Sequence, residues 1–120
     1  SRQVPPLRPS PGGMTREPQA EISEEAFLDA VAAIRFVNVD LSPIGAAILA
    51  ALHFAIADDS RSFSRKLGIE HALVLREVTA LSNVPLDLLS IVSRSERTQR
   101  TRYSLTDEGK RVLARAFAQN

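Results

Sequence analysis

The chain of 120 residues contains no cysteine, no tryptophan and only two histidines. Without cysteine it can form neither a disulfide nor a thiolate metal site, and two isolated histidines give no spacing of metal ligands. The sequence also lacks a glycine-rich loop for phosphates and any pairing of a nucleophile with a base. We therefore expect no enzyme, no metal site and no cofactor.

A long hydrophobic segment is missing as well. The longest apolar stretch, PIGAAILAALHFAIA at residues 43–57, is shorter than the ~20 residues that a transmembrane helix needs, and two acidic residues follow it. The first ten residues, SRQVPPLRPS, do not form the apolar core of a signal peptide. We expect a cytoplasmic protein without a membrane partner.

Acidic and basic side chains are divided unevenly along the chain, although its net charge is only +1. Residues 1–59 carry four basic and eight acidic side chains, whereas residues 60–120 carry eleven basic and six acidic ones. A basic half on a nearly neutral chain predicts a local anionic partner rather than a general affinity for charged surfaces.

Proline is concentrated near the N-terminus, where residues 1–20 hold five of the seven prolines and a Gly-Gly pair. Such a segment cannot bury enough apolar surface to order itself, so we expect a flexible arm. The remaining residues are long enough and apolar enough for one core. The sequence therefore predicts an arm at 1–20 and a single domain at 21–120.

Two helices are expected in the first half of this domain. Ser23 can cap the first one. Its apolar stripe, at helical spacing, consists of Phe27, Ala30, Val31 and Ile34. The Ser42-Pro43 pair is a start signal for the second helix, which we expect to continue to Ala57. Because this second helix is apolar on almost all sides, it should lie at the centre of the fold.

A short helix at 60–68 and a longer one at 69–83 follow, with Gly68 as the stop signal between them. At helical spacing, the longer helix buries a face made of Val74, Val78 and Leu81. The opposite face consists of Ala72, Arg76 and Thr79, with Leu73 leaning outward and Leu75 at the edge.

Two strands are expected next, at 86–94 and 100–106. In the second strand, one face has Thr101, Tyr103 and Leu105, and the other has Arg100, Arg102 and Ser104. The segment SERTQ between the strands has neither glycine nor proline, which favours an open, mobile loop over a tight turn. Four arginines lie here against one acid, Glu96: they are Arg94, Arg97, Arg100 and Arg102.

Thr106 can cap a last helix. The apolar stripe of this helix consists of Val112, Leu113, Ala116 and Phe117. The order of the elements predicts a mostly α domain of the α+β class, in which helices cover the apolar face of a two-stranded ribbon.

Three segments resemble one known family. The segment FSRKLGIEHALVLREVTAL at 63–81 resembles the helix-turn-helix of MarR-like winged-helix regulators. The segment YSLTDEGKRVL at 103–113 resembles the second wing strand of that family and its Leu-Thr-x-x-Gly-x-x-Leu tail, with matches at Leu105, Thr106, Gly109 and Leu113. The segment LSPIGAAILAAL at 41–52 is similar to the helix that leads into the motif.

The resemblance implies a winged helix-turn-helix domain with flanking N- and C-terminal helices. It also implies a sequence-specific, dimeric transcriptional regulator that binds double-stranded DNA. A recognition helix at about 70–83 would enter the major groove, and an arginine-rich wing at 94–102 would contact the backbone or the minor groove. The expected DNA contacts are Arg61, Arg65, Lys66, His71, Ala72, Leu73, Arg76, Thr79, Arg94, Arg97, Arg100 and Arg102.

The two terminal helices favour a homodimer, because their apolar stripes exceed what one small core needs. The expected dimer surface consists of Phe27, Val31, Ile34, Val112, Leu113 and Phe117.

A second interpretation is open. The family usually presents Ser, Thr, Asn or Gln near the start of its recognition helix, whereas this chain has His71, Ala72 and Leu73 there. The same fold could instead dock on another protein through the apolar face of this helix. The residues identify no small-molecule effector.

Overall fold

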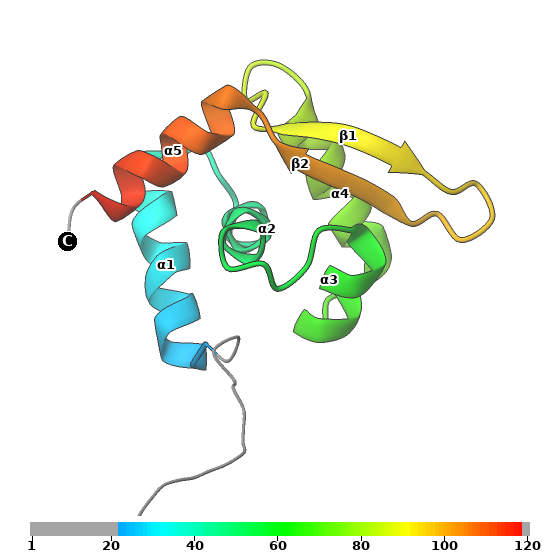
Figure 1. Cartoon of the computed structure of the whole chain (residues 1–120), viewed down its shortest axis with the longest axis horizontal. Helices are drawn as coiled ribbons and strands as arrows, with labels where there is room; N and C mark the ends of the chain where they lie inside the picture. Colours follow the sequence, from blue (N-terminus) through cyan, green and yellow to red (C-terminus); the bar gives the residue numbers. More distant parts are fainter. Residues whose placement is uncertain (1–21, 119–120) are drawn as a thin grey trace, which may run out of the picture.

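The computed structural model describes residues 22–118, which form five helices and a two-stranded antiparallel sheet, a mixed α+β fold (Figure 1). The elements are α1 (Glu24–Val37), α2 (Pro43–His53), α3 (Ser60–Leu67), α4 (His71–Ser82), β1 (Leu89–Arg94), β2 (Thr101–Leu105) and α5 (Asp107–Phe117). The arm expected at 1–20 lies outside the described residues. Within 22–118, none of the helices has the length and apolar character needed to cross a bilayer.

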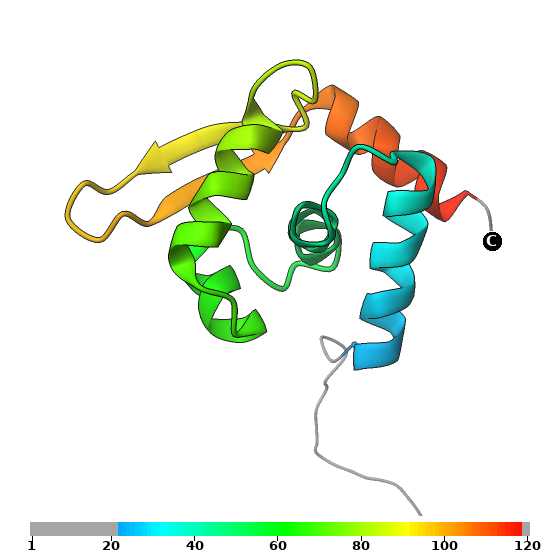
Figure 2. The same cartoon turned by 180° about the vertical axis from the view of Figure 1, so that it is seen from behind.

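The centre of the fold is α2, as its apolar sequence predicts. All its residues from Gly45 to Ala51 are buried, and Figures 1 and 2 show the helix nearly end-on with the other elements around it. Ser42 caps this helix, because its Oγ accepts a hydrogen bond from the Gly45 N–H (3.0 Å). The same hydroxyl donates to Glu77 Oε1 (2.8 Å), so it also fastens α2 to α4.

The end of α2 lies at His53, four residues before the predicted end at Ala57. Ala55 adopts the left-handed conformation (φ 58°), and the Ile56 N–H then donates to the Ala51 carbonyl (2.8 Å). This geometry closes a helix, and glycine is the residue that usually adopts it. Because alanine stands there, the sequence carries no signal for this end.

Only three residues separate α3 from α4. Asp59 caps α3, because its Oδ1 accepts a hydrogen bond from the Ser62 N–H (2.8 Å). Gly68 ends α3 in the left-handed conformation (φ 69°), as predicted. The face of α4 that was expected to be apolar is buried: it consists of Val74, Val78 and Leu81.

The two strands form a hairpin. β2 alternates as predicted, since Thr101 and Tyr103 are buried and Arg102 and Ser104 are exposed. Tyr103 belongs to the same hydrophobic core as α2 and α5, whereas Thr101 is a buried polar residue. The exposed side of β2 is therefore free for polar contacts.

The first strand begins at Leu89, three residues later than predicted. Asp87 has a left-handed backbone (φ 50°), and its N–H donates to the Asn83 carbonyl (2.9 Å), so the chain is still turning after α4. Leu88 is buried in this turn, and its N–H donates to the Leu81 carbonyl (2.7 Å). Apolar composition alone cannot distinguish such a buried turn from a strand.

The last helix is locked to the start of β1 through Thr106 and Gly109. Thr106 Oγ1 accepts a hydrogen bond from the Gly109 N–H (3.0 Å), which is the predicted cap, and donates to the Asp87 carbonyl (2.7 Å). A methyl group on Gly109 would overlap the carbonyl oxygen of Leu88. Glycine is therefore required where α5 meets the chain ahead of β1.

We predict that Gly109→Ala destabilises the fold by about 1–3 kcal/mol, because the backbone at Leu88 must move to admit the methyl group. At a helix position without such a close contact, replacing glycine with alanine would stabilise the fold, since alanine has the higher helix propensity. Urea unfolding measures the difference. Lys110→Ala, exposed on the same helix, is the matched control and should change stability by less than about 0.5 kcal/mol. A Gly109→Ala variant as stable as the wild type would contradict the close contact.

Candidate nucleic-acid interface

The fold brings the predicted DNA contacts to one end of the molecule. α3, α4 and the hairpin lie at this end, and α1 lies at the other (Figure 1). Arg61, Arg65 and Lys66 lie on α3; His71, Ala72, Leu73, Arg76 and Thr79 on α4; and Arg94, Arg97, Arg100 and Arg102 on the hairpin. Residues spread over about a third of the sequence thus share one region, while their contact with DNA stays a prediction.

The outward face of α4 has few charges. Ala72, Arg76 and Thr79 are exposed, and Leu73 is half-buried. Within residues 22–118, Arg76 forms no ion pair. Glu70 stands at the N-cap position, but its side chain makes no capping hydrogen bond, so a carboxylate remains exposed beside the start of the helix.

Two hairpin arginines are paired with acids of the α2–α3 connection. Arg102 Nη2 lies 3.2 Å from Asp58 Oδ2, and Arg100 Nη1 lies 3.3 Å from Asp59 Oδ2. The backbones meet at the same place, because the Tyr103 N–H donates to the Asp58 carbonyl (3.1 Å). Both arginines are exposed, as their alternation with Thr101 and Tyr103 predicts. Their acidic partners were not predicted, and they reach the arginines because the connection runs beside β2 and forms a bridge with it.

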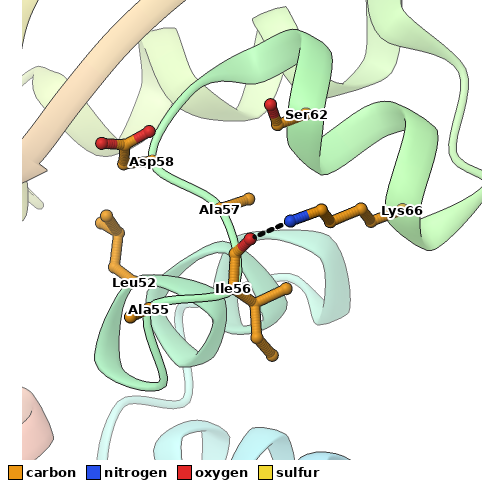
Figure 3. A pocket seen from close by; sticks show the side chains of 7 residues that line it. All are labelled: Leu52, Ala55, Ile56, Ala57, Asp58, Ser62 and Lys66. Atoms are coloured by element: carbon orange, nitrogen blue, oxygen red, sulfur yellow. Dashed lines mark hydrogen bonds between the residues drawn. The ribbon is translucent and has the colours of Figure 1, made fainter. Parts of the chain in front are cut away.

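Two of the three cations of α3 are held by backbone carbonyls. Arg61 donates to the Thr98 carbonyl from Nε (2.8 Å) and from Nη2 (2.6 Å). Lys66 Nζ donates to the Ile56 carbonyl (2.7 Å) across an open hollow of about 430 Å³ between α3 and the end of α2 (Figure 3). Arg65 is exposed and forms no ion pair within the described residues. Among the three cations of α3, Arg65 is therefore the one whose side chain is not already held by another group of residues 22–118.

The hairpin loop, residues 95–100, is closed by its own hydrogen bonds. The Ser95 N–H donates to the Arg100 carbonyl (2.9 Å), and the Gln99 N–H donates to the Ser95 carbonyl (2.8 Å). Gln99 has a left-handed backbone (φ 62°) and makes the bend that glycine would usually make. The connection is therefore longer than a tight two-residue turn, as predicted, but its own hydrogen bonds close it, so it is not open. Arg97, near the tip, is exposed and has no ion-pair partner in residues 22–118.

A small polar network joins α3, α4 and β2 beneath these cations. Ser60 Oγ accepts a hydrogen bond from the Thr101 N–H (3.0 Å) and lies 2.8 Å from His71 Nε2. Ser60 and Thr101 are fully buried. No sequence pattern indicated this network, because its serine and threonine lie 41 residues apart and both residue types are common on surfaces.

The environment of the network shifts two pKa values. Burial lowers the pKa of His71 and the positive charge of Arg61 lowers it further, which outweighs the opposing charge of Asp59 and favours the neutral imidazole. Burial alone would raise the pKa of Asp59, but hydrogen bonds from Ser62 and the charge of Arg100 outweigh it and lower that pKa. His71, which we expected on the surface, is instead half-buried within the network.

The apolar stripes that we expected at a dimer surface are used inside the chain. Four of those six side chains belong to its core: Phe27, Ile34, Val112 and Leu113. Val31 and Phe117 are half-buried, and the Phe117 ring stacks on His53 with 4.4 Å between the centroids. The single core therefore needs both terminal helices, which corrects the reason given for a dimer. A homodimer stays a prediction and needs another surface.

Residues 22–118 contain no cluster of three or more His, Cys, Asp or Glu side chains that could hold a metal ion. Comparisons with protein-family models, curated proteins and solved structures found no match. Any function proposed for this chain must therefore rest on its own geometry and charge.

We predict that the stability of the fold depends on His71 between neutral and mildly acidic pH. Because folding lowers this pKa below its ordinary value of 6.5, the unfolded chain binds the proton more readily. The free energy of unfolding should therefore fall as the pH decreases below about 6.5. His71→Gln, which keeps a polar group near Ser60, should reduce that fall, as measured by urea unfolding at about pH 7.5 and about pH 5.

The matched control is His53→Gln, which removes the other histidine of the chain. Equal pH dependence in the wild type and the His71→Gln variant, or an equal effect of both substitutions, would contradict the assignment to His71.

Proposed function

We propose that this chain is a winged helix-turn-helix protein that binds double-stranded DNA and regulates transcription. In this proposal α3 and α4 are the helix-turn-helix, α4 is the recognition helix and the hairpin is the wing. One observation carries it: three elements at one end of the fold each have an exposed cation without an ion pair in residues 22–118. These cations are Arg65 on α3, Arg76 on α4 and Arg97 in the hairpin loop. Neutralisation of phosphates by such groups supplies most of the non-specific affinity for DNA.

The size of α4 suits a major groove. Its 12 residues span about 18 Å, and the groove is about 12 Å wide and admits a helix. The Arg76 guanidinium can donate two hydrogen bonds to O6 and N7 of one guanine. Thr79, nearly one turn further along the same face, can reach an adjacent base. Sequence preference would therefore depend mainly on Arg76.

The hairpin suits the phosphate backbone or a narrow minor groove. Arg97 near its tip is exposed. Arg94 is also exposed, and among residues 22–118 its side chain donates only to the Thr101 hydroxyl (3.3 Å). The Arg102 and Asp58 side chains are 55% and 58% exposed, so their ion pair is weak and a phosphate can replace the carboxylate. Asp58 would then compete with DNA for Arg102.

A second function is supported by the composition of α4. Ala72 is exposed and Leu73 is half-buried, whereas Arg76 is the only basic residue of the helix apart from His71. A surface of this kind also suits docking on another protein. Absence of binding to any duplex DNA at low salt would favour this function over the first.

We predict that Arg97→Ala weakens binding to all DNA sequences alike and flattens the slope of log affinity against log salt by about 0.9, the value for one phosphate contact. Arg76→Ala should instead cost about 1–3 kcal/mol at one base position and relax the preference there. Binding titrations against several duplexes at several salt concentrations measure both effects.

The matched control is Arg111→Ala on α5, since Arg111 is exposed but paired with Glu108 (2.9 Å). An unchanged slope in Arg97→Ala, or the same change in Arg111→Ala, would contradict the proposed role of the loop. Uniform weakening by Arg76→Ala would make Arg76 a phosphate contact rather than a reader of bases.

We also predict that Asp58→Asn tightens binding to every duplex and steepens the salt slope by up to about 0.9, because Arg102 loses its competing carboxylate. Glu108→Gln removes the partner of Arg111 in the same way on α5 and should leave binding nearly unchanged. Weaker binding by Asp58→Asn in a stably folded variant would show that the ion pair positions Arg102 for DNA rather than competing with it.

A further inference from the structure

The outward face of α1 is apolar and exposed. Leu28, Ala32 and Phe36 recur at i, i+4 and i+8, which places them along one side of the helix. Leu28 is 55% exposed and Phe36 is 77% exposed; Val39, just beyond the helix, is 82% exposed. Since the opposite side of α1 is used in the core, this outward face is the one that remains for a partner.

Exposed large apolar side chains are concentrated on α1 and just beyond its end. Of the five large ones in residues 22–118, three lie between residues 28 and 39. Single exposed apolar residues are ordinary on protein surfaces, whereas contiguous ones mark surfaces that bind a partner.

The two ends of the same helix carry opposite charges. Glu24 and Glu25 lie in the first turn of α1, and Arg35 lies in the last. Within residues 22–118 none of them forms an ion pair, and Arg35 makes only a long hydrogen bond from Nε to the Leu41 carbonyl (3.4 Å). If two such helices lie antiparallel, the acidic end of each meets the basic end of the other.

We infer that this face binds a second copy of the chain, with the two α1 helices antiparallel about a two-fold axis near Ala32. Leu28 of each copy then packs near Phe36 of the other, and the small side chain of Ala32 lets the helices approach closely. A two-fold interface requires a surface that is complementary to itself. About an axis near Ala32, Arg35 of each copy lies opposite the exposed Asp29 of the other, and Glu25 lies about one turn further along. The charges along α1 are therefore complementary to themselves.

This interface is separate from the proposed DNA surface. α1 lies across α2 from α3, and the hairpin points away from it, in both Figure 1 and Figure 2. A second copy on α1 therefore leaves α4 and the hairpin loop uncovered. The oligomeric state can be tested without DNA, and its outcome is independent of the proposed function.

Light scattering and sedimentation equilibrium of the full chain should show a dimer at ~50 µM. Leu28→Glu and Phe36→Glu should each raise the dissociation constant by about tenfold or more and leave the circular dichroism spectrum unchanged, because both side chains are exposed. Val92→Glu is the matched control. Val92 has nearly the same exposed fraction as Leu28 (59%), but it lies on β1, in the hairpin.

A second experiment tests the antiparallel arrangement. Arg35→Glu makes both ends of α1 acidic, and Glu24→Lys combined with Glu25→Lys makes both ends basic. Each variant alone should dissociate more readily than the wild type, and an equimolar mixture of the two should form a mixed dimer. A parallel pair would already bring like ends together in the wild type, so neither variant alone would then dissociate more readily than the wild type.

A wild-type chain that is monomeric at ~500 µM overturns the inference. So does a dimer that persists in Phe36→Glu, or one that is lost equally in Val92→Glu. Charge variants that each dimerise as strongly as the wild type overturn the antiparallel arrangement, and a mixture that forms no mixed dimer overturns the charge pairing.

Discussion

The burial of α2 is the constraint on which the rest of the structure depends. A helix that is buried from Gly45 to Ala51 cannot be covered by one neighbour, so several elements must surround it. α1 and α5 pack against it, as do α4 and β2. Each of these elements places its apolar face in the core and keeps the other for solvent or a partner. The position of Arg76 on α4, and of Leu28 and Phe36 on α1, follows from this division.

The hairpin depends on a second set of contacts, which are polar. A hairpin of two strands is only marginally stable by itself. Here two residues at the start of α3 form hydrogen bonds with its backbone: Ser60 Oγ accepts from the Thr101 N–H, and Arg61 donates to the Thr98 carbonyl. These bonds hold the hairpin loop in a fixed relation to α3 and α4, as a docking surface on a duplex would require. The same arrangement brings two carboxylates against two arginines. The contacts that fix the hairpin thus also reduce its net positive charge.

Much of this fold could be predicted from short-range chemistry. The caps at Ser23, Ser42, Asp59 and Thr106 mark the starts of four helices, because a short polar side chain before a helix satisfies its free N–H groups. The faces of α4 and β2 follow from the periods of a helix and a strand. The residues of the candidate interface were instead implied by the resemblance to winged-helix regulators, supported by the concentration of positive charge in the second half of the chain.

What could not be predicted depends on contacts between distant residues or on unusual backbone angles. Ala55, Asp87 and Gln99 adopt left-handed conformations without being glycine, so one helix end, one strand start and the closed hairpin loop were missed. The pairing of Arg102 with Asp58 joins residues 44 positions apart. The stripe on the inner side of α1 looked available for a dimer, because amphipathic spacing cannot tell which neighbour will cover it.

The proposed binding of DNA can be tested most directly by mapping the residues that respond to DNA by nuclear magnetic resonance. Labelled full-length chain would be titrated with duplex DNA of mixed sequence at low salt. We expect the amide signals of α4 and of residues 95–100 to shift, those of α1 to stay unchanged, and the shifts to diminish as salt is added. The absence of any shift at low salt, or shifts confined to α1, would contradict the proposed binding.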